Sequence, residues 1–296
     1  MKITAVIDIG SNSIRLMLAE VNGHEIRSIS KRLVMTRMGQ NLYGSMILHP
    51  DAIQRGAQAV SDFADDARDE GAQEILVFAT SAVRSASNRQ EFIKLVKKMT
   101  GIDVDVISGE QEAELGFIGA VNGNGGVLDI GGGSTEVICG KNGGIEYTKS
   151  FDIGTVRAHD IFGDTYRGGE TCVIEWAQKP FSAAAQSKPI LECEKWTGIG
   201  GTVTQMAVLD LKMPRYEPDA VQGHVMGIET VEEMLCTLWS ISLEQREALI
   251  GMDPRRADII PFGAAITLAF MRAVSAKCLF VSDRDNMEGY LIKHLK

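Results

Sequence analysis

The chain is organised around the stretch Val127-Leu-Asp-Ile-Gly-Gly-Gly-Ser-Thr-Glu-Val-Ile138. It begins as an apolar strand that ends at Asp129, turns on three consecutive glycines, and continues through Ser134 and Glu136 into a second apolar run. Such a turn can bring backbone N–H groups and a hydroxyl close to an anion, because glycine has no Cβ atom. The same pattern also fits a tight β-hairpin without any ligand. The stretch alone leaves both interpretations open.

A second copy of this layout lies near the N-terminus, in Val6-Ile-Asp-Ile-Gly-Ser-Asn-Ser-Ile-Arg-Leu-Met17. The aligned pairs are Asp8 with Asp129, Gly10 with Gly131, Ser13 with Ser134, and Arg15 with Glu136. Each copy runs on to an Asn-Gly pair, at 22–23 and 142–143, which is a strong hairpin signal. Internal similarity of this kind indicates a duplicated domain. We therefore expect two glycine turns, each preceded by an aspartate, to face one another across a cleft.

The composition is that of an acidic globular protein. Its 296 residues suffice for two domains, and a hydrophobic fraction of 45% is typical of folded chains. The formal net charge of −9 argues against nucleic acid and anionic membranes as partners. The longest nearly apolar run, 259–271, is too short to span a bilayer, and no cleavable signal pattern is present. The five cysteines form no C-x-x-C pair, so we expect reduced thiols and a cytoplasmic location.

The order of elements predicts an α/β fold. The expected elements are strands at 2–8, 14–21 and 24–35, a helix at 50–71, a strand at 74–79, a helix capped by Asn88 that ends at Gly101, a strand at 104–107, and a second set of three strands within 125–148. By fold analogy this order is the half-unit of the ribonuclease H-like, actin-like fold. We predict two such domains, with mixed sheets flanked by helices and the active-site cleft between them. Domain I is placed at 1–122, with the C-terminal helix 284–296 as a candidate addition, domain II at 123–283, and the hinge at 122–126.

The segment Ser108-Gly-Glu-Gln111 matches a capping box, so Glu112 lies near a helix start and past the end of a strand. Glu112, Gly116 and Gly119 share one face of that helix, which predicts close approach of a ligand or of the other domain. A first-turn glutamate can also favour the helix dipole without any catalytic role. The turn in Trp196-Thr-Gly-Ile-Gly-Gly-Thr-Val203 suits an anion, although any strand-to-helix junction can use it. The spacing leaves these alternatives open.

A set of segments in fixed order carries a family resemblance. The segments are Asp8-Ile-Gly-Ser-Asn-Ser13, Arg37-Met-Gly39, Ala79-Thr-Ser-Ala-Val-Arg-Ser-Ala-Ser-Asn88, Ile107-Ser-Gly-Glu-Gln-Glu-Ala113, Asp129-Ile-Gly-Gly-Gly-Ser-Thr-Glu136, Gly198-Ile-Gly-Gly-Thr202, Arg256-Ala-Asp258 with Gly263, and Ser282-Asp283 with Glu288-Gly289. Over residues 6–291 the chain resembles the exopolyphosphatase/guanosine pentaphosphate phosphatase family of the actin-like phosphotransferase superfamily. Three positions depart from the family pattern: Asn41 replaces a frequent glycine, Gln111 a glutamate, and Met287 a common arginine.

The resemblance implies a role for each matched position. Glu112 corresponds to the general base, and Asp129 and Glu136 to the acids that hold a divalent cation, Mg²⁺ or another. The implied phosphate contacts are Asp8, Gly10, Asn12, Ser13, Arg84, Gly131, Gly132, Gly133, Ser134, Gly200, Gly201 and Thr202.

These roles imply a metal-dependent hydrolase of the exopolyphosphatase or guanosine pentaphosphate phosphatase type. It would release terminal phosphate from inorganic polyphosphate or guanosine pentaphosphate by Glu-assisted attack of water. One alternative is an ATP-dependent small-molecule kinase of the same superfamily, and another is a non-catalytic actin-like sensor of phosphorylated nucleotide. The expected partner is a polyphosphate or guanosine polyphosphate substrate, with a homodimer as a possible assembly.

Overall fold

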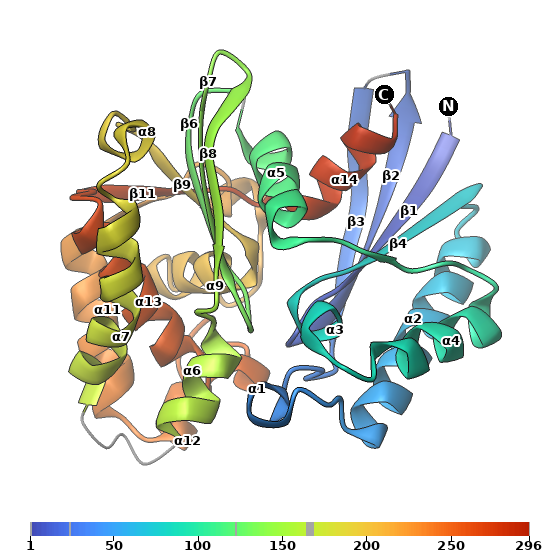
Figure 1. The fold of residues 1–296 in the computed structure, drawn as a ribbon, viewed down its shortest axis with the longest axis horizontal. Helices are drawn as coiled ribbons and strands as arrows, with labels where there is room; N and C mark the ends of the chain where they lie inside the picture. The colour runs from blue at the N-terminus through green and yellow to red at the C-terminus, as the bar shows by residue number, and fades with distance from the viewer. Residues whose placement is uncertain (1, 24, 122, 164–168, 296) are drawn as a thin grey trace.

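The computed structural model describes residues 2–23, 25–121, 123–163 and 169–295. Its strands are β1 (Lys2–Ile9), β2 (Ser13–Asn22), β3 (Glu25–Met35), β4 (Glu74–Ala79), β5 (Asp105–Val106), β6 (Gly125–Ile130), β7 (Thr135–Lys141), β8 (Gly144–Phe151), β9 (Trp196–Ile199), β10 (Val225–Gly227) and β11 (Cys278–Val281). Its helices are α1 (Leu42–Ser45), α2 (Pro50–Asp69), α3 (Ser81–Ser85), α4 (Arg89–Thr100), α5 (Gly109–Ala120), α6 (Thr155–Phe162), α7 (Gly169–Ala184), α8 (Lys188–Leu191), α9 (Gly200–Asp210), α10 (Pro218–Val221), α11 (Ile228–Ser240), α12 (Leu243–Glu247), α13 (Ile260–Ala273) and α14 (Asn286–His294), with a 3-10 turn at Pro254–Arg256. Figure 1 shows how these elements form an α/β structure around two sheets.

The first sheet has five strands in the order β3-β2-β1-β4-β5. Strands β1, β2 and β3 pair antiparallel, whereas β4 joins β1 and β5 joins β4 in parallel. Strand β1 is apolar and buried on both faces, as expected of a central strand. Its residues Ala5, Ile7 and Ile9 pack in the core formed with α2 and α4, while Val6 packs with α14 on the other side.

The second sheet has six strands in the order β10-β11-β9-β6-β7-β8. Strands β6, β7 and β8 repeat the antiparallel unit, and β9 and β11 repeat the parallel additions. In the first sheet Asp8 lies opposite Arg15, and in the second Asp129 lies opposite Glu136. The predicted duplication of the three-stranded unit is therefore confirmed.

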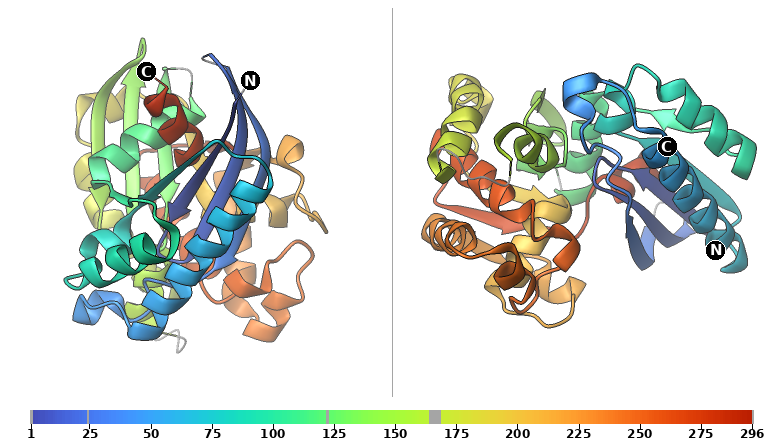
Figure 2. Two further views of the ribbon diagram at one scale, coloured as in Figure 1. Left: turned by 90° about the vertical axis from the view of Figure 1, so that its right-hand side faces the viewer. Right: turned by 90° about the horizontal axis from the view of Figure 1, so that it is seen from below.

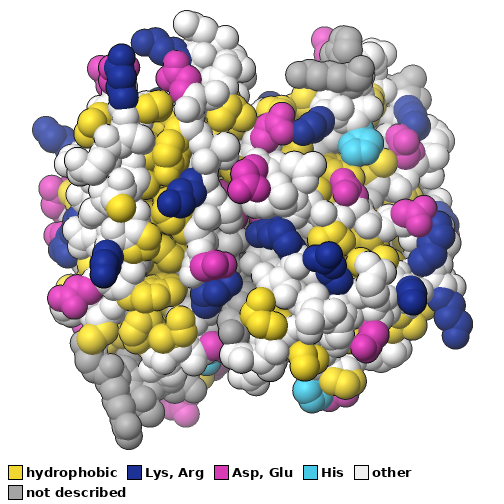
Figure 3. All heavy atoms as spheres, in the orientation of Figure 1, with side chains coloured by type: hydrophobic (Ala, Val, Ile, Leu, Met, Phe, Trp, Pro, Cys, Tyr) yellow, Lys and Arg dark blue, Asp and Glu magenta, His cyan; other side chains and the backbone are white. Residues whose placement is uncertain are grey.

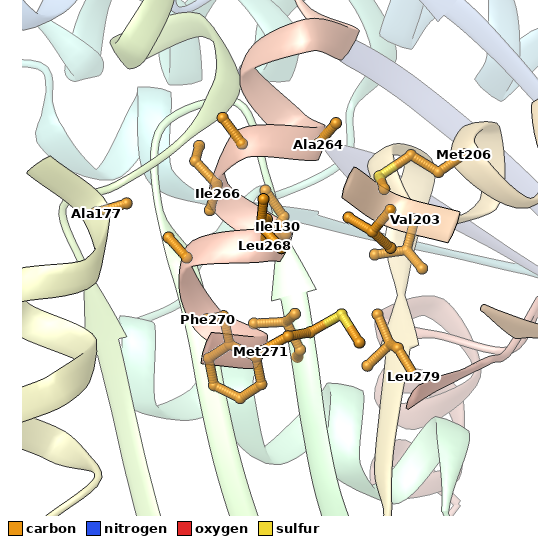
Figure 4. Close-up of a cluster of buried hydrophobic side chains, with 14 of the residues drawn as sticks. Ile130, Ala177, Val203, Met206, Ala264, Ile266, Leu268, Phe270, Met271 and Leu279 are labelled. Carbon is orange, nitrogen blue, oxygen red and sulfur yellow. The ribbon is translucent and has the colours of Figure 1, made fainter. Parts of the chain in front are cut away.

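The largest core fills the second half, between its sheet and α7, α11 and α13. Figure 4 shows α13 residues Ile266, Leu268 and Phe270 beside Ile130 of β6 and Val203 of α9. Because Ile130 is the last residue of β6, this packing fixes the strand end from which the glycine turn departs.

Helices α5 and α14 lie between the two sheets and contact each other (Figure 1). Helix α5 packs on β6, β7 and β8 of the second sheet, whereas α14 packs on β1 of the first. In the left view of Figure 2 the red α14 lies between the green and the blue parts of the molecule. An ideal Cβ on Gly119 would lie 2.0 Å from the carbonyl oxygen of Asp285, at the start of α14. The close approach predicted for the glycine face of α5 is therefore made by α14.

Some local expectations differ from the structure. The strand expected over 104–107 is confined to Asp105–Val106, where only two residues pair with β4. Asn88 precedes α4 but its side chain does not cap the helix. It instead accepts from the N–H and donates to the carbonyl of Leu48, and so satisfies loop backbone groups. Asn122 of the predicted hinge lies outside the described residues, and the division into two domains stays a prediction.

Two surface observations bear on partners. On the face shown in Figure 3, acidic and basic side chains are interspersed and no continuous basic patch is visible. Among the described helices, none is both long and apolar enough to cross a membrane.

Candidate active site

The two glycine turns have the same internal geometry. The N–H of Gly10 donates to the carbonyl of Ser13 at 3.0 Å, and the N–H of Gly131 donates to that of Ser134 at 2.9 Å. These two N–H groups are therefore used within their turns. Because glycine lacks a Cβ, each chain can close on itself this tightly: an ideal Cβ on Gly10 would lie 2.9 Å from the Ser13 carbonyl.

The segment after each third strand forms hydrogen bonds with a carbonyl of the glycine turn. The carbonyl of Asn12 accepts from the N–H groups of Thr36 and Arg37 at 3.1 and 2.8 Å. That of Gly132 accepts from Val156, at the start of α6, at 2.8 Å. In the part of the chain that is described, the N–H groups of Gly132 and Gly133 have no such acceptor. This arrangement suits a loop that presents donors to an anion.

A third turn joins β9 to α9 at Gly200, whose φ of +76° lies in the left-handed region. No side chain caps this end of α9, so the first N–H groups of the helix, at Gly200, Gly201 and Thr202, remain available to an anion. The hydroxyl of Thr202 donates to the carbonyl of Ile130 at 2.7 Å. That hydroxyl therefore ties this turn to the Gly131 turn, and Thr202 offers its backbone to a ligand.

Glu112 reaches the cleft from the first turn of α5. The predicted capping box is present: Ser108 accepts from the N–H of Gln111, and the Gln111 side chain accepts from the N–H of Ser108. Arg84 donates to Oε2 of Glu112 at 2.7 Å and to the carbonyl of Ile107 at 3.1 Å. Burial raises the pKa of Glu112 to about 7, and the charge of Arg84 offsets only part of that effect. Glu112 is thus a carboxylate poised to exchange a proton near neutral pH.

The other buried acids differ in how far a neighbouring positive charge opposes the effect of burial on their pKa. Asp8 accepts from Nε of Arg15 at 3.0 Å, and burial still raises the pKa of Asp8 against that opposing charge. Burial raises the pKa of Asp129 to about 6. Burial also raises the pKa of Glu136 well above its ordinary range, and the nearby acids Glu112 and Asp129 add to the effect. Glu136 accepts from Ser150 through Oε1, while its buried Oε2 has no hydrogen-bond partner among the described residues.

These elements enclose a narrow cleft of about 80 Å³. The predicted site residues that line it are Asp8, Gly10, Asn12, Ser13, Glu112, Asp129, Gly131, Gly132, Gly133, Ser134, Gly200, Gly201 and Thr202. Arg84 and Glu136 do not line it. Arg84 is bonded to Glu112, and Glu136 lies across the strand pair from Asp129. Asp8 lines the cleft, but an ionised carboxylate accepts hydrogen bonds and repels phosphate, so Asp8 would need a proton or a cation to contact it.

Two further cleft residues had no role assigned from sequence. Arg256 is 8% exposed, and its guanidinium lies 2.7 Å from the position of an ideal Cβ on Gly201. Burial lowers the pKa of Arg256 to about 10, and the charge of Asp253 opposes that effect only in part. The backbone N–H of Arg256 donates to the carbonyl of Asp253 at 2.8 Å, whereas its guanidinium makes no hydrogen bond or ion pair with the described residues. Asn286, the first residue of α14, donates to Oδ2 of Asp129 at 2.9 Å. Arg256 stood in a matched segment of the sequence, whereas nothing in sequence tied Asn286 to Asp129.

The described residues contain no group of three or more His, Cys, Asp or Glu side chains placed to hold a metal ion. A cation at Asp129 and Glu136 would therefore take its remaining ligands from water and substrate oxygens, as Mg²⁺ commonly does.

Comparison with known proteins identifies the family. The sequence profile of the Ppx/GppA phosphatase family matches residues 16–296. "Exopolyphosphatase 2" of Mycobacterium tuberculosis is 31% identical over 309 aligned residues, which cover 96% of this chain and 96% of that protein. The "Guanosine-5'-triphosphate,3'-diphosphate pyrophosphatase" of Photobacterium profundum is 28% identical and aligns with 96% of this chain and 58% of its own length.

Solved structures agree with the sequence matches. The crystal structure of the Ppx/GppA family member of Aquifex aeolicus superposes with a TM-score of 0.82 at 29% identity, covering 99% of this chain and 97% of that one. An exopolyphosphatase from Cytophaga hutchinsonii shares the fold, with a TM-score of 0.89 at 24% identity and coverage of 99% and 98%. With this actin-like fold and the family profile along nearly its whole length, the chain belongs to the Ppx/GppA phosphatase family and is a hydrolase of that type.

Proposed function

We propose that this phosphatase releases the terminal phosphate of inorganic polyphosphate or guanosine pentaphosphate by Glu112-assisted attack of water. The observation that carries the proposal is Glu112 itself, a buried carboxylate with a pKa of about 7 that lines a cleft walled by the two glycine turns. The names of the relatives from M. tuberculosis and P. profundum support these two substrate classes.

The acids at the second turn fit a divalent cation. In the first turn, the cross-strand partner of Asp8 is Arg15, which neutralises it. In the second turn, the partner of Asp129 is another acid, Glu136, whose buried Oε2 lacks a hydrogen-bond partner among the described residues. Neither Asp129 nor Glu136 is ion-paired among the described residues, and the charge of Arg15 offsets the effect of burial on Asp129 only in part. Two adjacent buried carboxylates of this kind call for a bound cation or a proton. We assign Asp129 and Glu136 to Mg²⁺ or a similar ion, which when bound would neutralise charge on the phosphoryl oxygens.

The residues of the chain then divide the remaining work. Arg84 donates to Oε2 of Glu112 and so orients the carboxylate, which would accept a proton from water. As that O–H bond breaks, the water oxygen forms the new P–O bond, and the bridging P–O bond breaks with its electrons on the departing phosphate chain. The N–H groups of Gly132 and Gly133, those at the start of α9, and the unpaired Arg256 would stabilise the charge on the transferred group.

A second cavity of about 440 Å³ adjoins the cleft at Gly200, Gly201 and Arg256. It offers room for the part of the substrate that is not transferred. Its lining combines cations such as Arg15 and Arg255 with apolar side chains such as Met213. Both a phosphate chain and a nucleoside polyphosphate are compatible with this mixture.

The test is phosphate release from short polyphosphate, long polyphosphate and guanosine pentaphosphate in parallel, with and without Mg²⁺. We expect Mg²⁺-dependent release from at least one of the three. Transfer of γ-phosphate from ATP to an added metabolite, without release from these substrates, would instead identify a kinase. Binding of guanosine pentaphosphate without turnover would identify a sensor. A homodimer and a cytoplasmic location remain predictions.

A further inference from the structure

The start of helix α14 is fixed to the first sheet. Asp285 caps the helix by accepting from the N–H of Met287 at 3.0 Å, and its own N–H donates to Glu288 at 3.0 Å. Arg15 of β2 is ion-paired with Asp285, and Lys31 of β3 contacts Glu288 at 2.7 Å. A reciprocal cap held by two strand cations leaves the first turn of α14 little freedom.

Asn286 projects from this anchored turn to the opposite sheet. Its Nδ2 donates to Oδ2 of Asp129 at 2.9 Å, a contact between residues 157 positions apart, and Asn286 is only 3% exposed. The reverse amide orientation would place two acceptor oxygens together, so the carboxylate of Asp129 selects this one.

The carbonyl end of the Asn286 amide indicates the role of this side chain. Oδ1 of Asn286 is buried and has no donor among the described residues. It lies 2.8 Å from the position of an ideal Cβ on Gly116 of α5. A buried carbonyl without a donor is destabilising. The amide therefore weakens the local fold at one end while it orients Asp129 at the other.

The remaining oxygen of Asp129 is confined as well. An ideal Cβ on Gly200 would lie 2.5 Å from Oδ1 of Asp129, so the carboxylate lies between the Asn286 amide and the turn before α9. Rotation of the carboxylate would cost the hydrogen bond to Asn286, and a side chain larger than that of glycine at position 200 would meet Oδ1.

We infer that Asn286 is a positioning residue, whose amide orients Asp129 to hold the divalent cation. This inference rests on the proposed function, since it takes Asp129 as a cation ligand. Asn286 belongs to a helix that is anchored on the first sheet, and Asp129 belongs to the second sheet. Cation affinity would therefore depend on how the two sheets are placed relative to each other. Partners that orient a metal ligand typically change metal affinity or activity by about 10-fold to 100-fold when removed.

The experiment titrates Mn²⁺ into the full chain without substrate and follows free Mn²⁺ by electron paramagnetic resonance. Asn286→Leu removes the donor at similar volume, and Asn286→Ala removes it without bulk near Gly116. Both should weaken Mn²⁺ binding about 10-fold or more and raise the Mg²⁺ concentration for half-maximal phosphate release.

Two further variants separate the explanations. Met287→Ala, on the neighbouring buried position of α14, disturbs helix packing without touching Asp129 and should bind Mn²⁺ like the wild type. Wild-type Mn²⁺ affinity in both Asn286 variants, or an equal loss in Met287→Ala, would overturn the positioning role. Asp129→Asn tests the cation site itself: if it binds Mn²⁺ normally, the proposed cation assignment fails, and the positioning role fails with it. If only Asp129→Asn loses binding, the cation site stands and Asn286 has no role in it.

Discussion

Glu112→Gln is the substitution that tests the centre of the site. Gln is nearly isosteric, and its carbonyl can still accept from Arg84, which also keeps its hydrogen bond to the Ile107 carbonyl. What is lost is the ability to accept a proton from water. General-base catalysis is worth about 10²-fold to 10⁴-fold, so phosphate release should fall by that factor while substrate binding persists.

The same substitution should stabilise the protein at alkaline pH. The pKa of Glu112 is raised from its ordinary 4.5 to about 7, so the folded state retains a proton that the unfolded chain has already lost. Stability therefore falls as pH rises from about 4.5 to about 7, and the loss is complete above that window. At about 1.4 kcal/mol per pKa unit, the ionised side chain costs the fold on the order of 3 kcal/mol. Gln carries no such cost.

Urea unfolding at about pH 5 and about pH 8 measures this difference. The variant should gain on the order of 3 kcal/mol over the wild type at the higher pH and much less at the lower. Glu110→Gln is the matched control, because Glu110 lies on the same turn of α5 but is exposed. Near-normal phosphate release in Glu112→Gln would remove Glu112 from catalysis. An equal stability gain at both pH values would show that its ionisation is not penalised by burial.

Three other outcomes are expected. Arg84→Gln should raise the pKa of Glu112 further, because the guanidinium charge lowers it; the acidic limb of the kcat/KM profile should move to higher pH, and an unmoved limb would contradict the pairing. Gly119→Ala should destabilise the fold by about 1–3 kcal/mol in urea unfolding, since its Cβ would meet the α14 backbone at 2.0 Å, whereas Gly44→Ala, with open space around it, should change stability by about 0.5 kcal/mol or less. Chelation by EDTA should abolish phosphate release and Mg²⁺ should restore it, with Asp129→Asn requiring more Mg²⁺; an unchanged rate in EDTA would exclude the cation from the reaction.

Local sequence patterns were sufficient for most of the elements. The apolar runs that end at Asp8 and Asp129 and the Asn-Gly pairs that follow them are short-range signals, and they predicted both three-stranded units. The Ser108 capping box placed Glu112 in the first turn of α5 for the same reason. Asn88 shows the limit of such signals: its side chain, typical of a helix cap, instead forms hydrogen bonds with the backbone of Leu48, a buried residue in an otherwise exposed loop.

By itself, the sequence determined the fold class, the duplicated glycine turns and the residue types that line the cleft, because each depends on neighbours along the chain. Only the tertiary structure decided which side chain lies beside each buried acid, and therefore whether its charge is neutralised. The strand register puts Arg15 beside Asp8 but Glu136 beside Asp129, and the packing of α14 on α5 carries Asn286 to a carboxylate 157 residues away. The buried and unpaired Arg256 is also a tertiary feature. Burial and long-range pairing set charge and pKa, and neither is a property of a local stretch of sequence.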